Sequence, residues 1–345
     1  MNFKKTAIVL ATLTTLISAA NARDQIKIVG SSTVYPFTSY VAEEFGATTG
    51  NPTPVVESTG TGGGMKLFCA GVGLDTPDFT NASRPMKAAE FAICQNNGVK
   101  NIVGMVVGFD GISIAQSKEN PALNLSLEQV FLALAEEVPS KDGKSLVKNP
   151  YKKWSDIDAS LPNREIRVLG APTTSGTRDA FDEMVMQKAS KKFEAYGKNK
   201  GKYKKVRNDG AFVPAGENDN LIVQKLAQDK TALGYFGYSF LEENKDKISG
   251  VNLNNIEPTF ENISSGKYPV SRSLYVYMKA DHIGKVKGIQ EYFDLYITDQ
   301  MIGEKGVLRT IGLIPMPQDM LQKVQNSVKA GKTLTAEMAK NNQVF

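Results

Sequence analysis

A chain of 345 residues is too long for one hydrophobic core and suits two domains. Its formal net charge of +5 argues neither for nor against nucleic acid as a partner. Two cysteines and one histidine are too few for a zinc site or a Cys/His catalytic pair.

The first 22 residues have the form of a Sec-type signal peptide. Lys4 and Lys5 give a basic start, residues 7–19 are largely apolar, and the Ala-Asn-Ala of residues 20–22 is a small-x-small cleavage site. No later run approaches the ~18 apolar residues that a membrane-spanning helix needs. We therefore expect a periplasmic protein that begins at Arg23, and losing both lysines lowers its net charge from +5 to +3.

Segments typical of strands and helices alternate along the mature chain. Strands are expected at residues 25–29, 54–57, 102–107, 112–116, 166–170, 232–235 and 274–278. Helices are expected at residues 38–46, 127–135, 177–190, 220–229, 285–296 and 319–329, and surface loops at 139–149 and 197–216. This alternation predicts an α/β fold with mixed sheets covered by helices.

Clusters of small hydroxyl and glycine residues precede four of the helix-like segments. They are SSTVYPF at 31–37, STGTGGGMKLF at 58–68, ASRPMKAAEF at 82–91 and TTSGTRDAF at 173–181. The first turn of a helix has unpaired N–H groups and a partial positive charge, which suit an anion. One such cluster would be an ordinary helix cap, but four of them, with Arg84 and Arg178 included, predict an oxyanion site.

Three further features have mainly structural readings. Cys69 and Cys94 are expected to form a structural disulfide in an oxidising compartment. His282 is expected in a surface turn. Residues 188–207 hold nine basic residues and one acid, for which a solvated face, steering of a small anion and contact with an acidic membrane all stay open.

An enzyme, such as a secreted phosphatase or serine hydrolase, is the alternative of a different class. A catalytic triad needs an oriented base beside its nucleophile, and the sequence has no G-x-S-x-G, HExxH or Asp/His metal cluster. We therefore expect a binding protein with no catalytic residues, no cofactor and no metal. Nothing in the sequence favours an adhesin or a structural protein.

In their order and spacing, these pieces resemble the periplasmic phosphate-binding proteins of ABC importers, a branch of the type 2 solute-binding fold. The resemblance covers essentially the whole mature chain, including GYFGYSF at 234–240 and SLYVYMK at 273–279. It implies lobe I at residues 23–111 and 277–345, lobe II at 112–276, two hinge crossings, and a ligand in the cleft. The implied partners are inorganic phosphate, a permease pair and its ATPase. Nucleic acid is not implied, and we expect a monomer.

The resemblance also implies the phosphate-binding residues. They are the side chain or backbone of Ser32, Thr33, Val34, Thr61, Ser83, Arg84, Ser175, Gly176, Thr177 and Arg178. For the two arginines, a surface position of Arg84 and a salt bridge from Arg178 to Asp179 or Asp182 remain as alternatives.

One departure from the family concerns the choice of ligand. Arg84 stands where the best-described members have an acid that accepts the proton of phosphate. Because sulfate at neutral pH carries no such proton, an acceptor distinguishes the two anions. Our hypothesis is that Asp110 replaces the acid, although it could instead cap a turn before Gly111. Sulfate, molybdate or a phosphorylated organic molecule is the alternative ligand.

Overall fold

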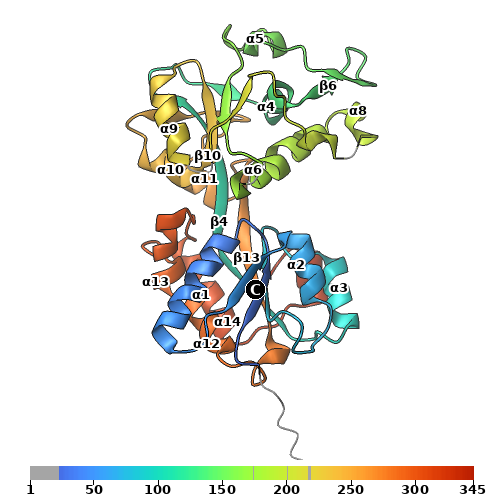
Figure 1. The fold of residues 1–345 in the computed structure, drawn as a ribbon, viewed down its shortest axis with the longest axis vertical. Coiled ribbons are helices and arrows are strands. Elements are labelled where there is room, and N and C mark those ends of the chain that lie inside the picture. Colours follow the sequence, from blue (N-terminus) through green and yellow to red (C-terminus); the bar gives the residue numbers. More distant parts are fainter. Residues whose placement is uncertain (1–22, 174, 200, 217–218) are drawn as a thin grey trace, which may run out of the picture.

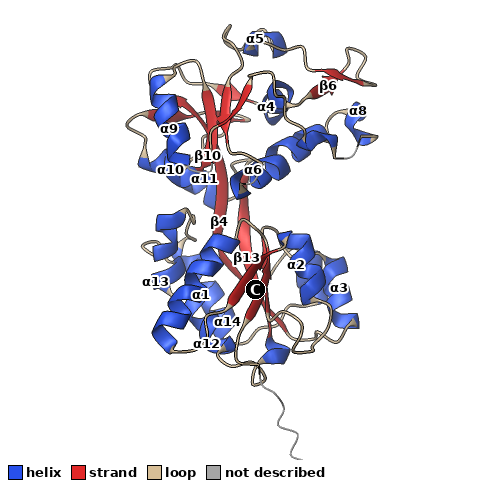
Figure 2. Ribbon diagram, viewed as in Figure 1, coloured by secondary structure: helices blue, strands red, loops and turns tan. Residues whose placement is uncertain are grey.

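A computed structural model describes residues 23–173, 175–199, 201–216 and 219–345, so the predicted signal peptide lies outside it. Within these residues, strands and helices alternate in a mixed α/β fold, which confirms the predicted class (Figure 2). None of the described helices is long and apolar enough to cross a membrane.

One mixed sheet extends through both halves of the molecule. Nine strands of the described chain form it, in the order β2-β1-β3-β13-β4-β10-β8-β9, with β11 also paired to β4. They are β1 (Lys27–Gly30), β2 (Val55–Ser58), β3 (Phe79–Ala82), β4 (Ile102–Ser117), β8 (Val168–Gly170), β9 (Phe212–Pro214), β10 (Leu233–Gly237), β11 (Ile248–Gly250) and β13 (Ser271–Lys279). Short pairs are formed by β5 (Asn124–Leu125) with β12 (Asn252–Leu253) and by β6 (Glu137–Pro139) with β7 (Leu146–Lys148).

The strands β4 and β13 connect two lobes (Figure 1). They pair antiparallel from Ser271 opposite Gly111 to Lys279 opposite Ile102. In lobe I, β13 also pairs with β3, and in lobe II, β4 also pairs with β10 and β11. Both lobes are therefore built on the same two strands, while the limits at residues 111/112 and 276/277 stay a prediction.

Helices cover the sheet in each lobe. Lobe I has α1 (Tyr35–Thr49), α2 (Gly60–Phe68), α3 (Ala88–Asn96), α12 (Ile289–Tyr296), α13 (Asp299–Ile302), α14 (Gln318–Lys329), α15 (Ala336–Lys340) and the 3-10 turns η3 (Ala280–His282) and η4 (Val307–Ile311). Lobe II has α4 (Leu127–Leu134), α5 (Trp154–Ile157), α6 (Gly176–Phe181), α7 (Lys188–Ser190), α8 (Glu194–Gly197), α9 (Asp219–Gln228), α10 (Tyr238–Glu243), α11 (Phe260–Ser264), a π-helix η1 (Asp182–Gln187) and a 3-10 turn η2 (Lys202–Lys204). In α14, for example, Leu321, Val324 and Val328 recur at helical spacing and are buried.

The predicted strands at 102–107 and 112–116 are one strand, β4, which is buried along nearly its whole length. Gly108 adopts a φ of 153°, and β13 has a register shift between Leu274 and Tyr275 beside it. A side chain at Gly108 would meet the Ile314 carbonyl oxygen at 2.7 Å. Glycine therefore lets the strand bend between the lobes without ending.

Three further expectations about segments were wrong in part, and one strand was not predicted. The segment 197–216 contains β9, whose Phe212 is buried against the sheet, and 139–149 contains β7 of a hairpin. The strand β3 was not predicted, because its sequence FTNA has no apolar run, yet all four residues are buried. The predicted helix at 177–190 is divided into α6, η1 and α7.

The prediction of a surface turn at His282 was also wrong, because its side chain is fully buried. His282 Nδ1 lies 2.6 Å from Asp78 Oδ1, and Nε2 lies 3.2 Å from the Val72 carbonyl oxygen. The buried Asp78 carboxylate also accepts hydrogen bonds from the Arg23 guanidinium and the Lys27 N–H. A carboxylate removed from water needs such partners, and this one recruits a histidine from a distant segment.

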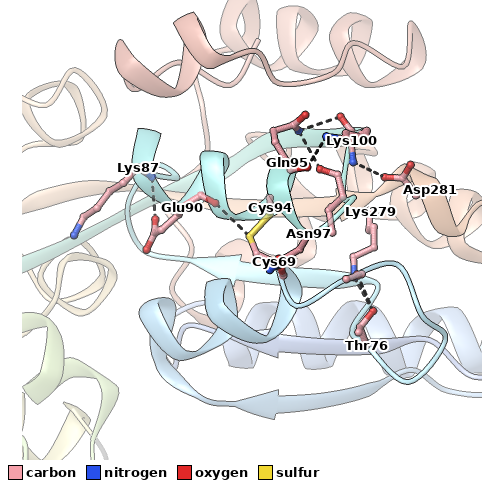
Figure 3. The surroundings of a disulfide bond; sticks show 12 residues. Cys69, Thr76, Lys87, Glu90, Cys94, Gln95, Asn97, Lys100, Lys279 and Asp281 are labelled. Atoms are coloured by element: carbon pink, nitrogen blue, oxygen red, sulfur yellow. Dashed lines mark hydrogen bonds between the residues drawn. A yellow bond between two sulfur atoms is a disulfide. The ribbon is translucent and has the colours of Figure 1, made fainter.

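The predicted disulfide between Cys69 and Cys94 is confirmed (Figure 3). It joins the end of α2 to α3, and the Asn97 side-chain amide donates to the Cys69 carbonyl at 2.8 Å. Nearby, the buried Lys279 Nζ donates to the Gly71 carbonyl and the Thr76 hydroxyl at 2.7 and 2.8 Å. Burial lowers the pKa of Lys279 to about 8.

Candidate functional site

The sheet of lobe I places three of the hydroxyl clusters at one edge. Strands β2 and β3 both pair parallel with β1, so their carboxyl ends meet at the same side. The residues that follow these ends are Ser31 after β1, Thr59 after β2 and Ser83 after β3. This is the position at which α/β sheets bind ligands.

Close packing of α2 on β1 fixes the second cluster. A Cβ at Gly64 would meet Gly30 Cα at 2.5 Å and Thr80 Oγ1 at 2.7 Å, so only glycine allows this approach. As a result Thr61, at the start of α2, lies beside Ser83. Their hydroxyl oxygens are 3.1 Å apart, and the Ser83 N–H donates to Thr61 Oγ1 at 3.1 Å.

The fourth cluster lies in lobe II and faces the first one. Ser175 caps α6, with its hydroxyl accepting from the Thr177 N–H at 3.2 Å. Across the gap between the lobes, the Ser32 hydroxyl donates to Asp179 Oδ2 at 3.5 Å. The first and fourth clusters therefore lie close to each other across the gap between the lobes.

Two neighbouring cavities, of about 220 and 270 Å³, lie where the clusters meet. Both are lined by Ser32 and Thr33. The predicted site residues that line at least one of them are Ser32, Thr33, Thr61, Ser83, Asp110, Ser175 and Thr177. Val34 and Gly176 do not line either cavity. Val34 is buried at the N-cap of α1 and follows Thr33, and Gly176 is the first residue of α6, between Ser175 and Thr177.

Arg84 does not line either cavity, and its guanidinium pairs with Glu90 instead. Two nitrogens of Arg84 lie 2.8 and 2.7 Å from the two oxygens of that carboxylate. The hydrogen bonds to Glu90 raise the pKa of Arg84. Glu90 also accepts from the Lys87 N–H at the start of α3. The structure thus gives Arg84 a role in holding this helix.

Arg178 likewise adopts the salt bridge that we named as its alternative. Its Nε lies 2.8 Å from Asp182 Oδ1, and its guanidinium lies 5.2 Å from the centre of the Phe212 ring. Burial raises the pKa of Asp182, opposed by the hydrogen bond from Arg178. The arginine lines a third cavity, on the side of Arg207, and neither of the two described above.

The sequence did not identify Arg272, which the structure places at the cavity. Arg272 lies on β13 directly opposite Asp110 on β4, and its Nε is 3.2 Å from Asp110 Oδ2. Its other nitrogens lie 2.8 Å from Thr33 Oγ1 and 2.7 Å from Glu183 Oε2. The available signal was a charged residue just before the apolar run LYVYM, at a predicted crossing between lobes.

Several known proteins are similar to this chain over most of its length. The profile of the PBP superfamily domain matches residues 18–300. Protein SphX of Synechococcus elongatus is 30% identical over 341 residues, covering 97% of this chain and 90% of that protein. The phosphate-binding protein PstS of Staphylococcus saprophyticus is 30% identical over 281 residues, which cover 80% of this chain and 76% of that one.

A solved structure gives the same result at the level of the fold. A possible phosphate-binding protein from Planctomyces limnophilus superposes with a TM-score of 0.73 at 28% identity. The superposition covers 90% of this chain and 99% of that structure. This chain therefore shares its fold with the Planctomyces protein.

Proposed function

The chain belongs to the PBP superfamily, in the family of PstS and SphX, and on that premise we propose that it binds inorganic phosphate outside the cytoplasm and delivers it to an ABC importer. The observation that supports this most is the convergence of hydroxyl groups from both lobes on neighbouring cavities. Uncharged donors at the starts of helices suit a small oxyanion and leave its chemistry unchanged. We accordingly propose a binding protein and no reaction.

We propose that the anion is bound by donors of three kinds. The hydroxyls of Thr33, Thr61, Ser83 and Ser175, with that of Ser32 at the rim, donate from the clusters. The backbone N–H groups of Val34, Gly176 and Thr177 contribute at the starts of α1 and α6, that of Thr177 once it has left Ser175 Oγ. Arg84 and Arg178 are also predicted ligands, but each would first have to leave its carboxylate, Glu90 or Asp182.

Asp110 is our proposed acceptor for the proton of phosphate. It lines the 220 Å³ cavity, and its Oδ2 faces Arg272 at 3.2 Å, which leaves Oδ1 for a ligand. A carboxylate oxygen can accept from the P–OH of hydrogen phosphate but repels an anion that has no proton. Asp110 would therefore select phosphate against sulfate.

Delivery to an importer follows from the proposed hinge. Closure of the lobes about β4 and β13 would bury the anion and strengthen each donor contact as water is removed. The closed form is then the one that a transmembrane permease pair, driven by its ATPase, would recognise. The signal sequence at residues 1–22 supports a periplasmic location.

A thermal-shift series on the protein purified free of phosphate tests the proposal. A ligand at 1,000 times its Kd stabilises the folded state by about 4 kcal/mol, so phosphate should raise the unfolding temperature clearly. Sulfate, molybdate and a phosphomonoester at the same concentration should raise it much less. A shift with sulfate and none with phosphate would contradict the proposal.

The role of Asp110 is tested separately by Asp110→Asn, which keeps the shape of the side chain and removes its charge. We expect phosphate affinity to fall and sulfate affinity to rise, so that the ratio of the two affinities falls by about 100-fold. Titration calorimetry with each anion measures both values. An unchanged ratio would mean that Asp110 does not select the ligand.

A further inference from the structure

We propose that Arg272 is the cationic ligand of the bound anion, and that Glu183 is a built-in competitor that occupies this arginine while the site is empty. The inference rests on the proposed function, because it concerns the same site. The sequence predicts that Arg84 and Arg178 provide the positive charge for the anion. We assign this role to Arg272, on a strand that crosses between the lobes.

Few of the described basic residues lie at the cavities. Among the described residues that line them, only Arg272 and Lys204 are basic, and both line the 270 Å³ cavity. Lys204 is exposed, so water screens its charge, whereas the Arg272 side chain is only 12% exposed. Arg272 is thus the stronger attraction for an anion that lies among the hydroxyls.

The contacts of Arg272 also prepare the site for a ligand. Its Nε is held by Asp110 on the neighbouring strand, and a terminal nitrogen donates to Thr33 Oγ1 at 2.8 Å. A hydroxyl that accepts this bond keeps its own proton free to donate. Arg272 therefore both holds Thr33 in the first cluster and leaves its O–H available to an oxyanion.

The remaining contact of Arg272 is with Glu183, in the π-helix η1 of lobe II. The distance from its nitrogen to Glu183 Oε2 is 2.7 Å, and the Glu183 side chain is 59% exposed. A carboxylate and a phosphate accept from a guanidinium in the same geometry. Because Glu183 is exposed and regains its contact with water when it leaves the arginine, an incoming oxyanion can take the place of this carboxylate at small cost.

Glu183 belongs to a group of acidic residues in lobe II that repel an anion. Asp179, Asp182 and Glu183 line the same cavity as Arg272, so an entering anion faces their repulsion. The charge of Asp182 is neutralised by Arg178. The charge of Glu183 is instead neutralised by Arg272, the group that would bind the anion. Removing the charge of Glu183 should therefore strengthen binding, while removing the charge of Arg272 should weaken it.

Phosphate titration calorimetry on four variants of the full mature chain tests the inference. We expect Arg272→Gln to bind about 30-fold more weakly than wild type, and Arg272→Lys, which keeps the charge but not the planar fork, about fivefold more weakly. Glu183→Gln should bind about fivefold more tightly. The control Arg167→Gln removes an equal charge from a surface pair with Asp229 and should stay within about twofold.

The outcomes separate this inference from the proposed function. If the wild type does not bind phosphate, the proposed function fails and the inference falls with it. If the wild type binds and Arg272→Gln binds within twofold of it, the inference alone is overturned. If Glu183→Gln binds phosphate more weakly than wild type, Glu183 does not compete with the anion for Arg272. Should Arg272→Gln not fold, the exposed Glu183→Gln and the charge-retaining Arg272→Lys carry the test.

Discussion

Lobe I and lobe II build their halves of the cavity in different ways. In lobe I, Thr61 and Ser83 come from separate clusters and are hydrogen-bonded to each other beside parallel strand ends. In lobe II, one loop supplies Ser175 and Thr177, and the charge beside it is neutralised within α6 and η1 by the pair Arg178–Asp182. Neither set of clusters presents a free cation to the cavities, and the described basic residues that line them are Arg272, on a strand that both lobes share, and the exposed Lys204.

The two lobes also differ in how firmly their clusters are held. In lobe I, α2 packs against β1 through Gly64 and is joined to α3 by the disulfide. In lobe II, the cluster lies on the six-residue helix α6, which continues into a π-helix. We infer that lobe I gives the site its geometry and that lobe II provides the moving half.

The largest expected effect tests the close packing in lobe I. In Gly64→Ala the new Cβ would meet the Gly30 backbone at 2.5 Å, so we expect a loss of about 3 kcal/mol or more in the free energy of unfolding. Gly63→Ala is the matched control, because its nearest neighbour would be Thr59 Cβ at 3.5 Å. Urea unfolding measures both. Equal stability of the two variants would refute tight packing of α2 on β1.

The disulfide is the next device that distinguishes the lobes. Replacing Cys69 and Cys94 together by alanine opens a loop with a sequence separation of 25 residues, and we expect a loss of roughly 3 kcal/mol. Urea unfolding under oxidising conditions measures it. Since α2 carries Thr61, phosphate affinity should fall as well. A stable variant with unchanged affinity would show that lobe I does not depend on this link.

The hydroxyls of the two lobes can be compared directly. Thr61→Val keeps the side-chain shape and removes a donor, so we expect phosphate and sulfate to bind about tenfold more weakly, with little change in their ratio. Ser175→Ala should weaken binding similarly and also cost about 1 kcal/mol of stability, because it removes the cap of α6. Calorimetry and urea unfolding separate the effects. If only one variant lost affinity, a single lobe would hold the anion.

The smallest expected effect concerns the buried ammonium group of Lys279 in lobe I. Burial lowers the pKa of Lys279 to about 8 in the folded chain, against about 10.4 in an unfolded one. Between these values the unfolded chain binds more protons, so the stability of wild type relative to Lys279→Met should rise with pH, by about 1 kcal/mol from pH 7 to about pH 8.7. Below about pH 7 the lysine is protonated in both states, so the difference should stay constant. Urea unfolding at both pH values checks it, and a difference that falls with pH would contradict a buried ammonium.

The hydroxyl clusters could be predicted because their signal is local. Each places Ser, Thr or Gly where a strand gives way to a helix, and parallel pairing brings three of those ends together. The partners of Arg84 and Arg178, by contrast, could not be predicted from the sequence. Glu90 and Asp182 lie close in sequence to Arg84 and Arg178, but whether they or a ligand take the guanidinium depends on tertiary packing.

The partners of Arg272 and His282 were still harder to predict, because they lie far away in the sequence. Asp110 is 162 positions from Arg272, and Asp78 is 204 positions from His282. Only the pairing of β13 with β4 and β3 brings these groups together. No local pattern identifies such partners, although a charged residue beside an apolar crossing strand is a reason to look for one.

The most direct measurement is a crystal structure of the mature protein with phosphate bound. The account predicts one phosphate between the lobes, in contact with hydroxyls of Thr33 and Thr61 from lobe I and Ser175 from lobe II. It also predicts that the guanidinium of Arg272 contacts the anion and that Glu183 has moved away. Phosphate held by one lobe alone, or outside the cavities that Thr33 lines, would contradict it.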